Sequence, residues 1–113
     1  MPNVRRGEIE VVFDGRPRTL VLTLGALAEL EAAFGADDLM ALAERFSKGR
    51  LGARDAARII AAGLKGAGES VSLDEVERMR AEGGAAGFAR AVADLLSATF
   101  GTASEDPPAP QEA

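Results

Sequence analysis

The side chains that could carry chemistry in this chain are mainly carboxylates, because it contains no histidine and no cysteine. The absence of histidine removes the usual general base near neutral pH and the commonest transition-metal ligand. The absence of cysteine excludes disulfides and thiolate catalysis, and it is compatible with a reducing compartment. No spacing among the remaining carboxylates, lysines, serines and threonines predicts an active site. We therefore predict that the chain is not an enzyme and binds no cofactor.

Acidic residues gather at two places where they could be imagined as metal ligands. One group is Asp37 with Asp38, and the other is Asp74, Glu75 and Glu77. Each group lies at the start of a predicted helix, where acids complement the helix dipole and cap free N–H groups. No second set of ligands has a recognisable spacing. We interpret both groups as helix-start signals and predict no metal site.

A glycine-rich stretch from Gly63 to Gly68 superficially resembles a phosphate-binding loop. No strand is predicted to lead into it, and the Gly-Lys-Ser/Thr order of a P-loop is absent. We interpret the stretch as the end of a helix and a loop, and the Gly83-Gly84 pair as a hinge between helices.

Charge is distributed unevenly along the chain, whose formal net charge is −5. Residues 44–65 hold six basic side chains against two acids, whereas residues 66–113 hold nine acids against three arginines. No aromatic residue interleaves with the basic ones to stack on a base, so nucleic acid is not an expected partner. Arg54 and Arg58 fit either a solvated helix face or a patch for an acidic protein. The opposite charges of the two segments could also orient copies of the chain head to tail.

A β-hairpin is predicted over residues 8–24, where apolar and polar side chains alternate on both sides of an Asp-Gly-Arg-Pro turn. Pairing of Phe13 with Arg18 across a four-residue loop would place Val11 opposite Leu20. The apolar face would then carry Ile9, Val11, Phe13, Leu20, Leu22 and Leu24.

The other face of this hairpin and its two edges are candidate contact surfaces. Val12 and Val21 would lie on the less buried face. A sheet of two strands leaves both outer edges unpaired, so an extended peptide could add to either one.

Four or five short helices are predicted to follow, each marked by apolar residues at helical spacing and by a glycine or a capping signal. The cleanest start is a capping box in which Ser72 precedes Glu75 by three residues. The segments are about 25–34, 39–48, 53–66, 73–82 and 86–100. The sequence thus predicts an α+β fold, with an N-terminal hairpin and helices packed on one of its faces.

The 113 residues are enough for one domain, which we predict over residues 7–101. Residues 1–6 are expected to be a flexible arm, and the acidic, proline-rich residues 102–113 a disordered tail. We find no signal peptide, and no apolar run approaches the roughly 18 residues that span a bilayer. We therefore expect a cytoplasmic protein without a membrane partner.

The last predicted helix has more apolar surface than a core requires. Its inward stripe consists of Phe88, Ala91, Val92, Leu95 and Thr99. An adjoining apolar strip consists of Ala89, Ala93, Leu96 and Phe100. A helix this apolar is either deeply buried or shared with a partner. Leu96 and Phe100 are therefore candidate partner contacts.

Residues 5–35, RRGEIEVVFDGRPRTLVLTLGALAELEAAFG, resemble the start of the tail assembly chaperones of gene transfer agents and related tailed phages. The shared features are a short Arg-Gly-Glu lead, an Asp-Gly hairpin and the run Leu-Thr-Leu-Gly-Ala-Leu-Ala-Glu-Leu-Glu. The resemblance extends through the short helices and the Leu-Lys-Gly-Ala-Gly close to about residue 101.

This resemblance implies a non-enzymatic chaperone that binds the tape-measure protein, helps tail-tube subunits to polymerise along it, and is absent from the mature particle. The alternative is a minor structural tail or connector subunit that stays in the particle. The family has no catalytic or metal-binding motif to transfer, so the contact residues are chosen on physical grounds. They are Val12, Val21, Leu96, Phe100, Arg54 and Arg58.

Overall fold

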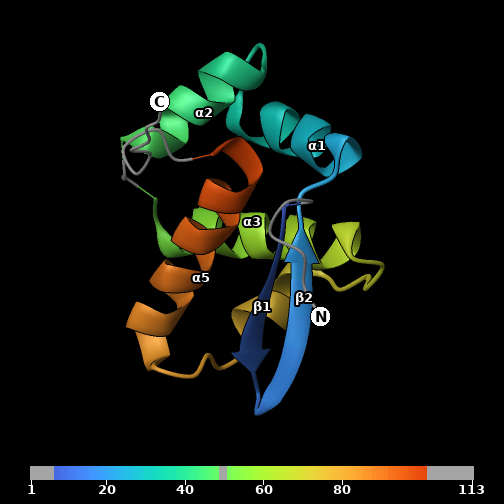
Figure 1. Cartoon of the computed structure of the whole chain (residues 1–113), viewed down its shortest axis with the longest axis vertical. Helices are drawn as coiled ribbons and strands as arrows, with labels where there is room; N and C mark the ends of the chain where they lie inside the picture. Colours follow the sequence, from blue (N-terminus) through green and yellow to red (C-terminus); the bar gives the residue numbers. More distant parts are fainter. Residues whose placement is uncertain (1–6, 49–50, 102–113) are drawn as a thin grey trace, which may run out of the picture.

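A β-hairpin and five helices make up the computed structural model, which describes residues 7–48 and 51–101. The elements are β1 (Glu8–Phe13), β2 (Arg16–Val21), α1 (Leu24–Phe34), α2 (Leu39–Ser47), α3 (Ala53–Gly66), α4 (Leu73–Glu77) and α5 (Gly84–Phe100). In Figure 1, α1 and α2 lie at one end of the molecule, and the hairpin turn lies at the other. This arrangement confirms the predicted α+β class. The expected arm, 1–6, and tail, 102–113, lie outside the described residues.

The hairpin closes through a two-residue turn, not the four-residue loop that we expected. Phe13 lies opposite Arg16, and Ile9 lies opposite Leu20, so the predicted register was wrong by two residues. Asp14 and Gly15 have φ angles of 55° and 76°, and positive φ at both central residues is what a type I′ turn requires. A shift of two residues leaves every side chain on its predicted face, because side chains alternate with a period of two.

The end of the hairpin also differs from the prediction. Leu24 was placed on the buried face of the second strand, but it begins α1 and is 74% exposed. Thr23 is the N-cap of this helix, and its hydroxyl oxygen accepts the Ala26 N–H at 3.1 Å. A threonine that caps the next helix cannot continue the strand, so the chain turns before Leu24.

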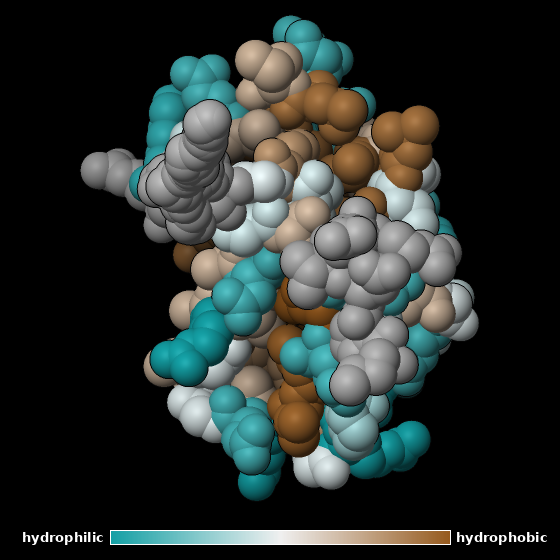
Figure 2. Space-filling view, in the orientation of Figure 1, coloured by the Kyte–Doolittle hydropathy of each residue, from teal (hydrophilic) through white to brown (hydrophobic). Residues whose placement is uncertain are grey.

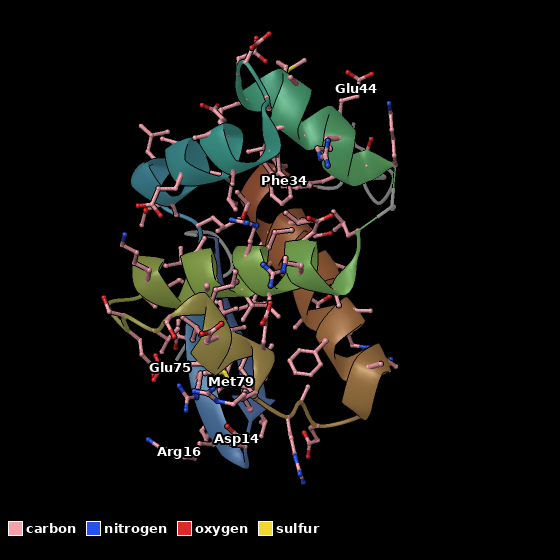
Figure 3. All side chains as sticks on the ribbon, turned by 180° about the vertical axis from the view of Figure 1, so that it is seen from behind. Asp14, Arg16, Phe34, Glu44, Glu75 and Met79 are labelled. Carbon is pink, nitrogen blue, oxygen red and sulfur yellow. The ribbon has the colours of Figure 1, made fainter. Side chains whose placement is uncertain are left out.

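The free edge of β1 is partly covered by the segment that follows α4. The helix ends at Glu77, whereas the pattern predicted an end near residue 82. The Glu82 N–H donates to the Val12 carbonyl at 3.2 Å, and the Asp14 N–H donates to the Arg80 carbonyl at 2.8 Å. Figure 3 shows Asp14 at the tip of the hairpin. The expectation of two unpaired edges was therefore wrong at this end of β1.

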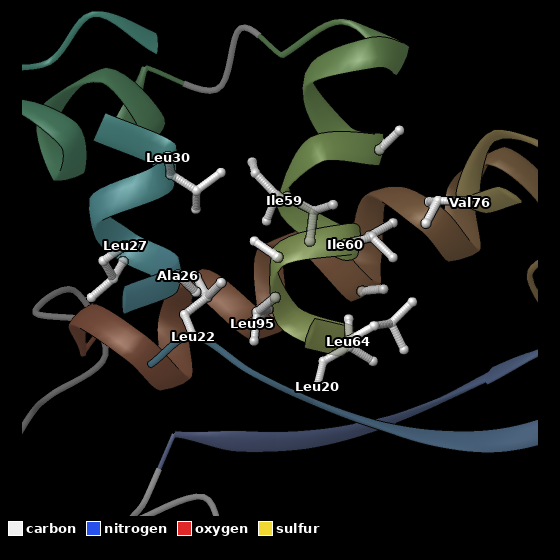
Figure 4. Close-up of a cluster of buried hydrophobic side chains, with 14 of the residues drawn as sticks. Leu20, Leu22, Ala26, Leu27, Leu30, Ile59, Ile60, Leu64, Val76 and Leu95 are labelled. Carbon is white, nitrogen blue, oxygen red and sulfur yellow. The ribbon is translucent and has the colours of Figure 1, made fainter. Parts of the chain in front are cut away.

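The core lies where α3 crosses the inner face of the hairpin, with α1 and α5 on either side. Figure 4 shows Leu20 and Leu64 meeting between the hairpin and α3, with Leu95 of α5 beside them. The largest fully buried side chains are Phe13, Leu20, Leu42, Ile59, Ile60, Leu64 and Leu95. The close crossing needs a residue without a side chain, because a Cβ at Gly66 would lie 2.0 Å from the Val21 carbonyl oxygen.

Candidate functional site

An apolar groove of about 690 Å³ runs between α3, α4 and α5. These three helices lie side by side in the rear view of Figure 3. The bulky side chains along the groove are Phe46, Ile60, Val76, Phe88, Val92 and Leu96. Between them lie the alanines Ala53, Ala56, Ala57, Ala85, Ala89 and Ala93. Because alanine side chains end at Cβ, the facing helices leave a channel instead of filling the space.

The groove side of α5 is the second apolar strip of that helix. Ala89, Ala93 and Leu96 have the i, i+4, i+7 spacing of one helix face, and all three line the groove. The neighbouring stripe, Ala91, Val92 and Leu95, is buried in the core. Ala89 and Ala93 are exposed and Leu96 is half-buried. The helix therefore covers the core with one face and presents a largely apolar face to solvent.

One mouth of the groove carries a pair of opposite charges. Arg54 of α3 and Glu77 of α4 both line it, and the Arg54 Nε lies 3.7 Å from a Glu77 carboxylate oxygen. The Arg54 side chain is 67% exposed, so the pair contributes little to stability and can rearrange when a ligand arrives. Arg58 is exposed one helical turn further along α3. The two arginines thus lie on the same side of α3.

Phe100 was predicted as a contact beside Leu96, but the structure places it in an aromatic cluster. Its ring lies 6.4 Å from that of Phe46. Phe46 in turn packs edge-on against Phe34 at 5.4 Å, and the Arg45 guanidinium lies 5.1 Å from the Phe34 ring centre. The cluster joins α1, α2 and α5 at one end of the groove. Phe100 is half-buried there. Its ring packs near Phe46, which lines the groove.

Val12 and Val21 are both half-buried and lie on the hairpin, away from the groove. Val12 borders a separate hollow of about 280 Å³ between β1 and α5. Figure 2 shows a narrow apolar band running between α5 and the hairpin. The six predicted contacts therefore do not form one surface. Arg54 and Leu96 line the groove, and a role of any of the six in partner binding stays a prediction.

Two of the acidic residues that resembled metal ligands, Asp38 and Glu75, make hydrogen bonds at the starts of helices. The Asp38 carboxylate accepts the Ala41 N–H at 2.8 Å at the start of α2. Ser72 and Glu75 form the predicted capping box, with the Ser72 N–H donating to the Glu75 carboxylate at 2.8 Å and the Glu75 N–H donating to the Ser72 hydroxyl at 3.1 Å. Residues 7–48 and 51–101 contain no cluster of three or more acids that could hold a metal ion. In the same ranges, no helix has the length and apolarity needed to cross a membrane.

Several groove residues were not identified from the sequence as parts of a site. Phe46 and Val76 come from α2 and α4, and their patterns indicated ordinary core positions. Ala53 and Ala56 share the helical spacing of the buried residues of α3, which is typical of a packed face, but Ala53 is exposed and Ala56 half-buried at the groove. The one sequence feature that pointed to this groove was the excess apolar surface of α5.

A family model described as phage tail tube protein, GTA-gp10, matches residues 6–102. This range contains the hairpin, all five helices of the described residues and the whole groove. Neither the curated proteins nor the solved structures that were compared with the chain include a match.

Proposed function

The chain belongs to the family described as phage tail tube protein, GTA-gp10, and we propose that its role there is that of a tail assembly chaperone. In this proposal it is not an enzyme. It binds apolar helical segments of the tape-measure protein in the bacterial cytoplasm, keeps them soluble, and assists polymerisation of the tail-tube subunits. It is then released and is absent from the mature particle.

The observation that carries this proposal is the groove between α3, α4 and α5. An amphipathic helix binds such a groove by laying its apolar face in it, with anchors at i, i+3 or i+4, and i+7. The alanines of α3 and α5 leave room for these anchors, and the bulky walls, such as Phe88 and Leu96, would contact them. The apolar surface on both partners would leave water on binding, which supplies the driving force.

The lining of the groove also supports binding over catalysis. Glu77 is the acid among its lining residues, and it is already paired with Arg54. The other side chains that line it are aliphatic or aromatic. A site of this composition can hold an apolar segment, but it offers no nucleophile and no free general base.

Co-expression tests the proposal. The tape-measure protein is produced with and without this chain, and a small acidic protein of similar size takes its place in a control. We expect soluble tape-measure protein and a complex that survives purification only when this chain is present. If the tape-measure protein stays insoluble with the chain present, and no complex is recovered, the chaperone role is contradicted.

The description of the family favours one other function, that of a structural subunit of the tail tube that stays in the particle. The two functions differ in whether the chain is a component of the finished particle. A tube subunit is present in many copies in purified particles, whereas a chaperone is absent or nearly so. Quantitative mass spectrometry of purified particles therefore separates the two functions.

A further inference from the structure

The outer edge of β1 is paired over only part of its length. Ala81 forms a bridge with Phe13, and the Glu82 N–H donates to the Val12 carbonyl at 3.2 Å. The glycines at 83 and 84 both have positive φ angles, and α5 begins at the second of them. Among the described residues the sheet consists of β1 and β2 alone. The part of β1 before Val12 therefore has no strand on its outer side.

Glu10 presents its backbone N–H and C=O to this open part of the edge. In an antiparallel ladder, alternate residues direct their backbone groups to opposite sides of the strand. The Val12 carbonyl is directed outward, to Glu82, so Glu10, two residues earlier, has the same orientation. Glu10 is exposed, and within the described residues neither of its backbone groups has a hydrogen-bond partner. One donor and one acceptor are thus available for an added strand.

The hollow of about 280 Å³ between β1 and α5 lies beside this edge, and we call it the edge hollow. Val11 and Val12 point to opposite faces of the sheet, yet both line it, so it follows the edge of β1 and not one face. Its other wall is a stretch of α5 with small side chains, which includes Ala86, Gly87 and Ala91. Figure 1 shows α5 on the β1 side of the hairpin. These small residues leave room for the side chains of an added strand.

The charged side chains of the edge hollow are mostly acidic. Glu10, Glu82 and Asp94 line it, and Arg90 is the basic residue among its lining. All four are exposed. Within residues 7–48 and 51–101, none of the four forms an ion pair. Their net negative charge is therefore not neutralised by contacts among the described residues, and it favours a positively charged ligand.

We propose that the outer edge of β1 and the edge hollow bind an extended, basic peptide segment of a partner protein, which adds to the sheet as a third strand. Antiparallel addition joins both backbone groups of Glu10 to a single residue of the segment. Basic side chains of the segment then lie near Glu10, Glu82 and Asp94, and apolar ones contact Val11. Backbone hydrogen bonds supply affinity in this mode of binding, and the alternate side chains supply specificity.

This site is separate from the groove between α3, α4 and α5. The two share no lining residue, because they lie against different faces of α5. The proposal goes beyond the chaperone function and does not depend on it. A chain with both sites can hold a helical segment and an extended segment at the same time.

The test titrates a peptide of alternating lysine and valine, KVKVKVK, into the isotope-labelled chain and follows the amide signals by NMR. We expect the peptide at saturation to slow hydrogen exchange of the Glu10 amide by about tenfold or more, because that N–H becomes hydrogen-bonded. The amide signals of residues 86–94, which include the α5 wall of the edge hollow, should shift with the same saturation. The acidic peptide EVEVEVE has the same alternation and should not bind. Raising the salt concentration should weaken binding of the lysine peptide at least several-fold, because the charges are exposed.

Methylation of peptide nitrogens tests for backbone pairing in the unaltered chain. One version of the lysine peptide carries methyl groups on the valine nitrogens, and another carries them on the lysine nitrogens. Alternate residues of a strand direct their N–H groups to opposite edges. We therefore expect one version to lose binding and the other to keep it, although both have the same charge.

Proline at position 10 tests the same pairing from the protein side. Glu10→Pro removes the outward N–H but no hydrogen bond between β1 and β2, so the chain should stay folded by circular dichroism. It should bind the lysine peptide about tenfold more weakly or worse. Thr19→Pro is the matched control, because Thr19 lies opposite Glu10 and its N–H faces the outer edge of β2. This control should bind like the wild type.

Four results would overturn the proposal. The first is a Glu10 amide that the lysine peptide does not protect at millimolar concentration. The second is equal binding of the acidic and basic peptides, and the third is unchanged binding by both methylated versions or by Glu10→Pro. The fourth is a Glu10 amide already protected in the free chain, which would mean that the chain itself or a second copy occupies the edge. None of these results involves the tape-measure protein, so the co-expression result decides the chaperone function separately.

Discussion

Replacing Gly66 with alanine should destabilise the protein by about 3 kcal/mol. The new Cβ would lie 2.0 Å from the Val21 carbonyl oxygen and 3.1 Å from the carbonyl carbon. Both atoms belong to the backbone, so they cannot move aside as the end of a flexible side chain can. Helix α3 would have to separate from β2, which would loosen the buried contact between Leu20 and Leu64. Urea unfolding followed by circular dichroism measures the loss.

The matched control is Gly25→Ala in α1. A Cβ at Gly25 would meet only the Thr23 hydroxyl, at an ordinary 3.9 Å. Alanine favours helix over glycine by up to about 1 kcal/mol, so this variant should be as stable as the wild type or slightly more stable. The same substitution should therefore have opposite effects at the two positions. Equal unfolding midpoints for Gly66→Ala and the wild type would contradict the close crossing of α3 and β2.

Replacing Ala93 with glutamate should weaken binding of an apolar tape-measure helix by about 100-fold or more. Ala93 is exposed in the free protein, so the fold should be unchanged. A bound helix would cover the new carboxylate and leave it without a partner in apolar surroundings. Burying a charge in this way costs several kcal/mol, and each 1.4 kcal/mol is a factor of ten in affinity. Isothermal titration with a tape-measure helical peptide measures the change.

The control for this variant is Ala32→Glu. Ala32 is also an exposed helical alanine, but it lies on α1 outside the groove. The two variants have the same composition and the same net charge, so they differ only in where the carboxylate lies. We expect Ala32→Glu to bind like the wild type. Wild-type affinity of Ala93→Glu would mean that the helix does not bind in the groove.

Local signals in the sequence predicted the parts of the fold that depend on local chemistry. The alternation of side chains identified both strands, and the Ser72–Glu75 capping box identified the start of α4. The register was wrong because Pro17 was interpreted as part of the turn. Pro17 lies in β2 opposite Val12, whose carbonyl points away from β2 to the Glu82 N–H. The missing N–H of Pro17 therefore faces the outer edge of the strand, where no ladder bond is lost.

The end of α4 could not be predicted from its own residues. Met79 and Val76 continue a helical apolar pattern, which favoured a helix to about residue 82. Instead, Arg80 and Glu82 exchange backbone hydrogen bonds with the hairpin turn and with β1. This competition comes from a strand more than 60 residues away along the chain. The helix propensities of residues 73–82 do not indicate this competition.

The groove was predictable only in part. The second apolar strip of α5 indicated surface beyond the needs of the core, and Leu96 does line the groove. The hollow itself depends on alanines of α3 and α5 facing each other across a gap. The spacing of alanines in a sequence is the same for two helices in direct contact and for two helices separated by a groove. Phe46 of α2 and Val76 of α4 also line the space between α3 and α5, and these contacts between distant segments have no local pattern in the sequence.

Methyl NMR with a tape-measure helical peptide tests most directly whether this groove is the binding site. The wild-type chain is labelled at its alanine, isoleucine, leucine and valine methyl groups, and the peptide is titrated into it. If the groove binds the helix, the methyl signals of Ile60, Val92 and Leu96 shift with saturation, while those of Val12 and Val21 on the hairpin stay in place. Shifts confined to the hairpin, or no shifts at any concentration of peptide, would contradict it.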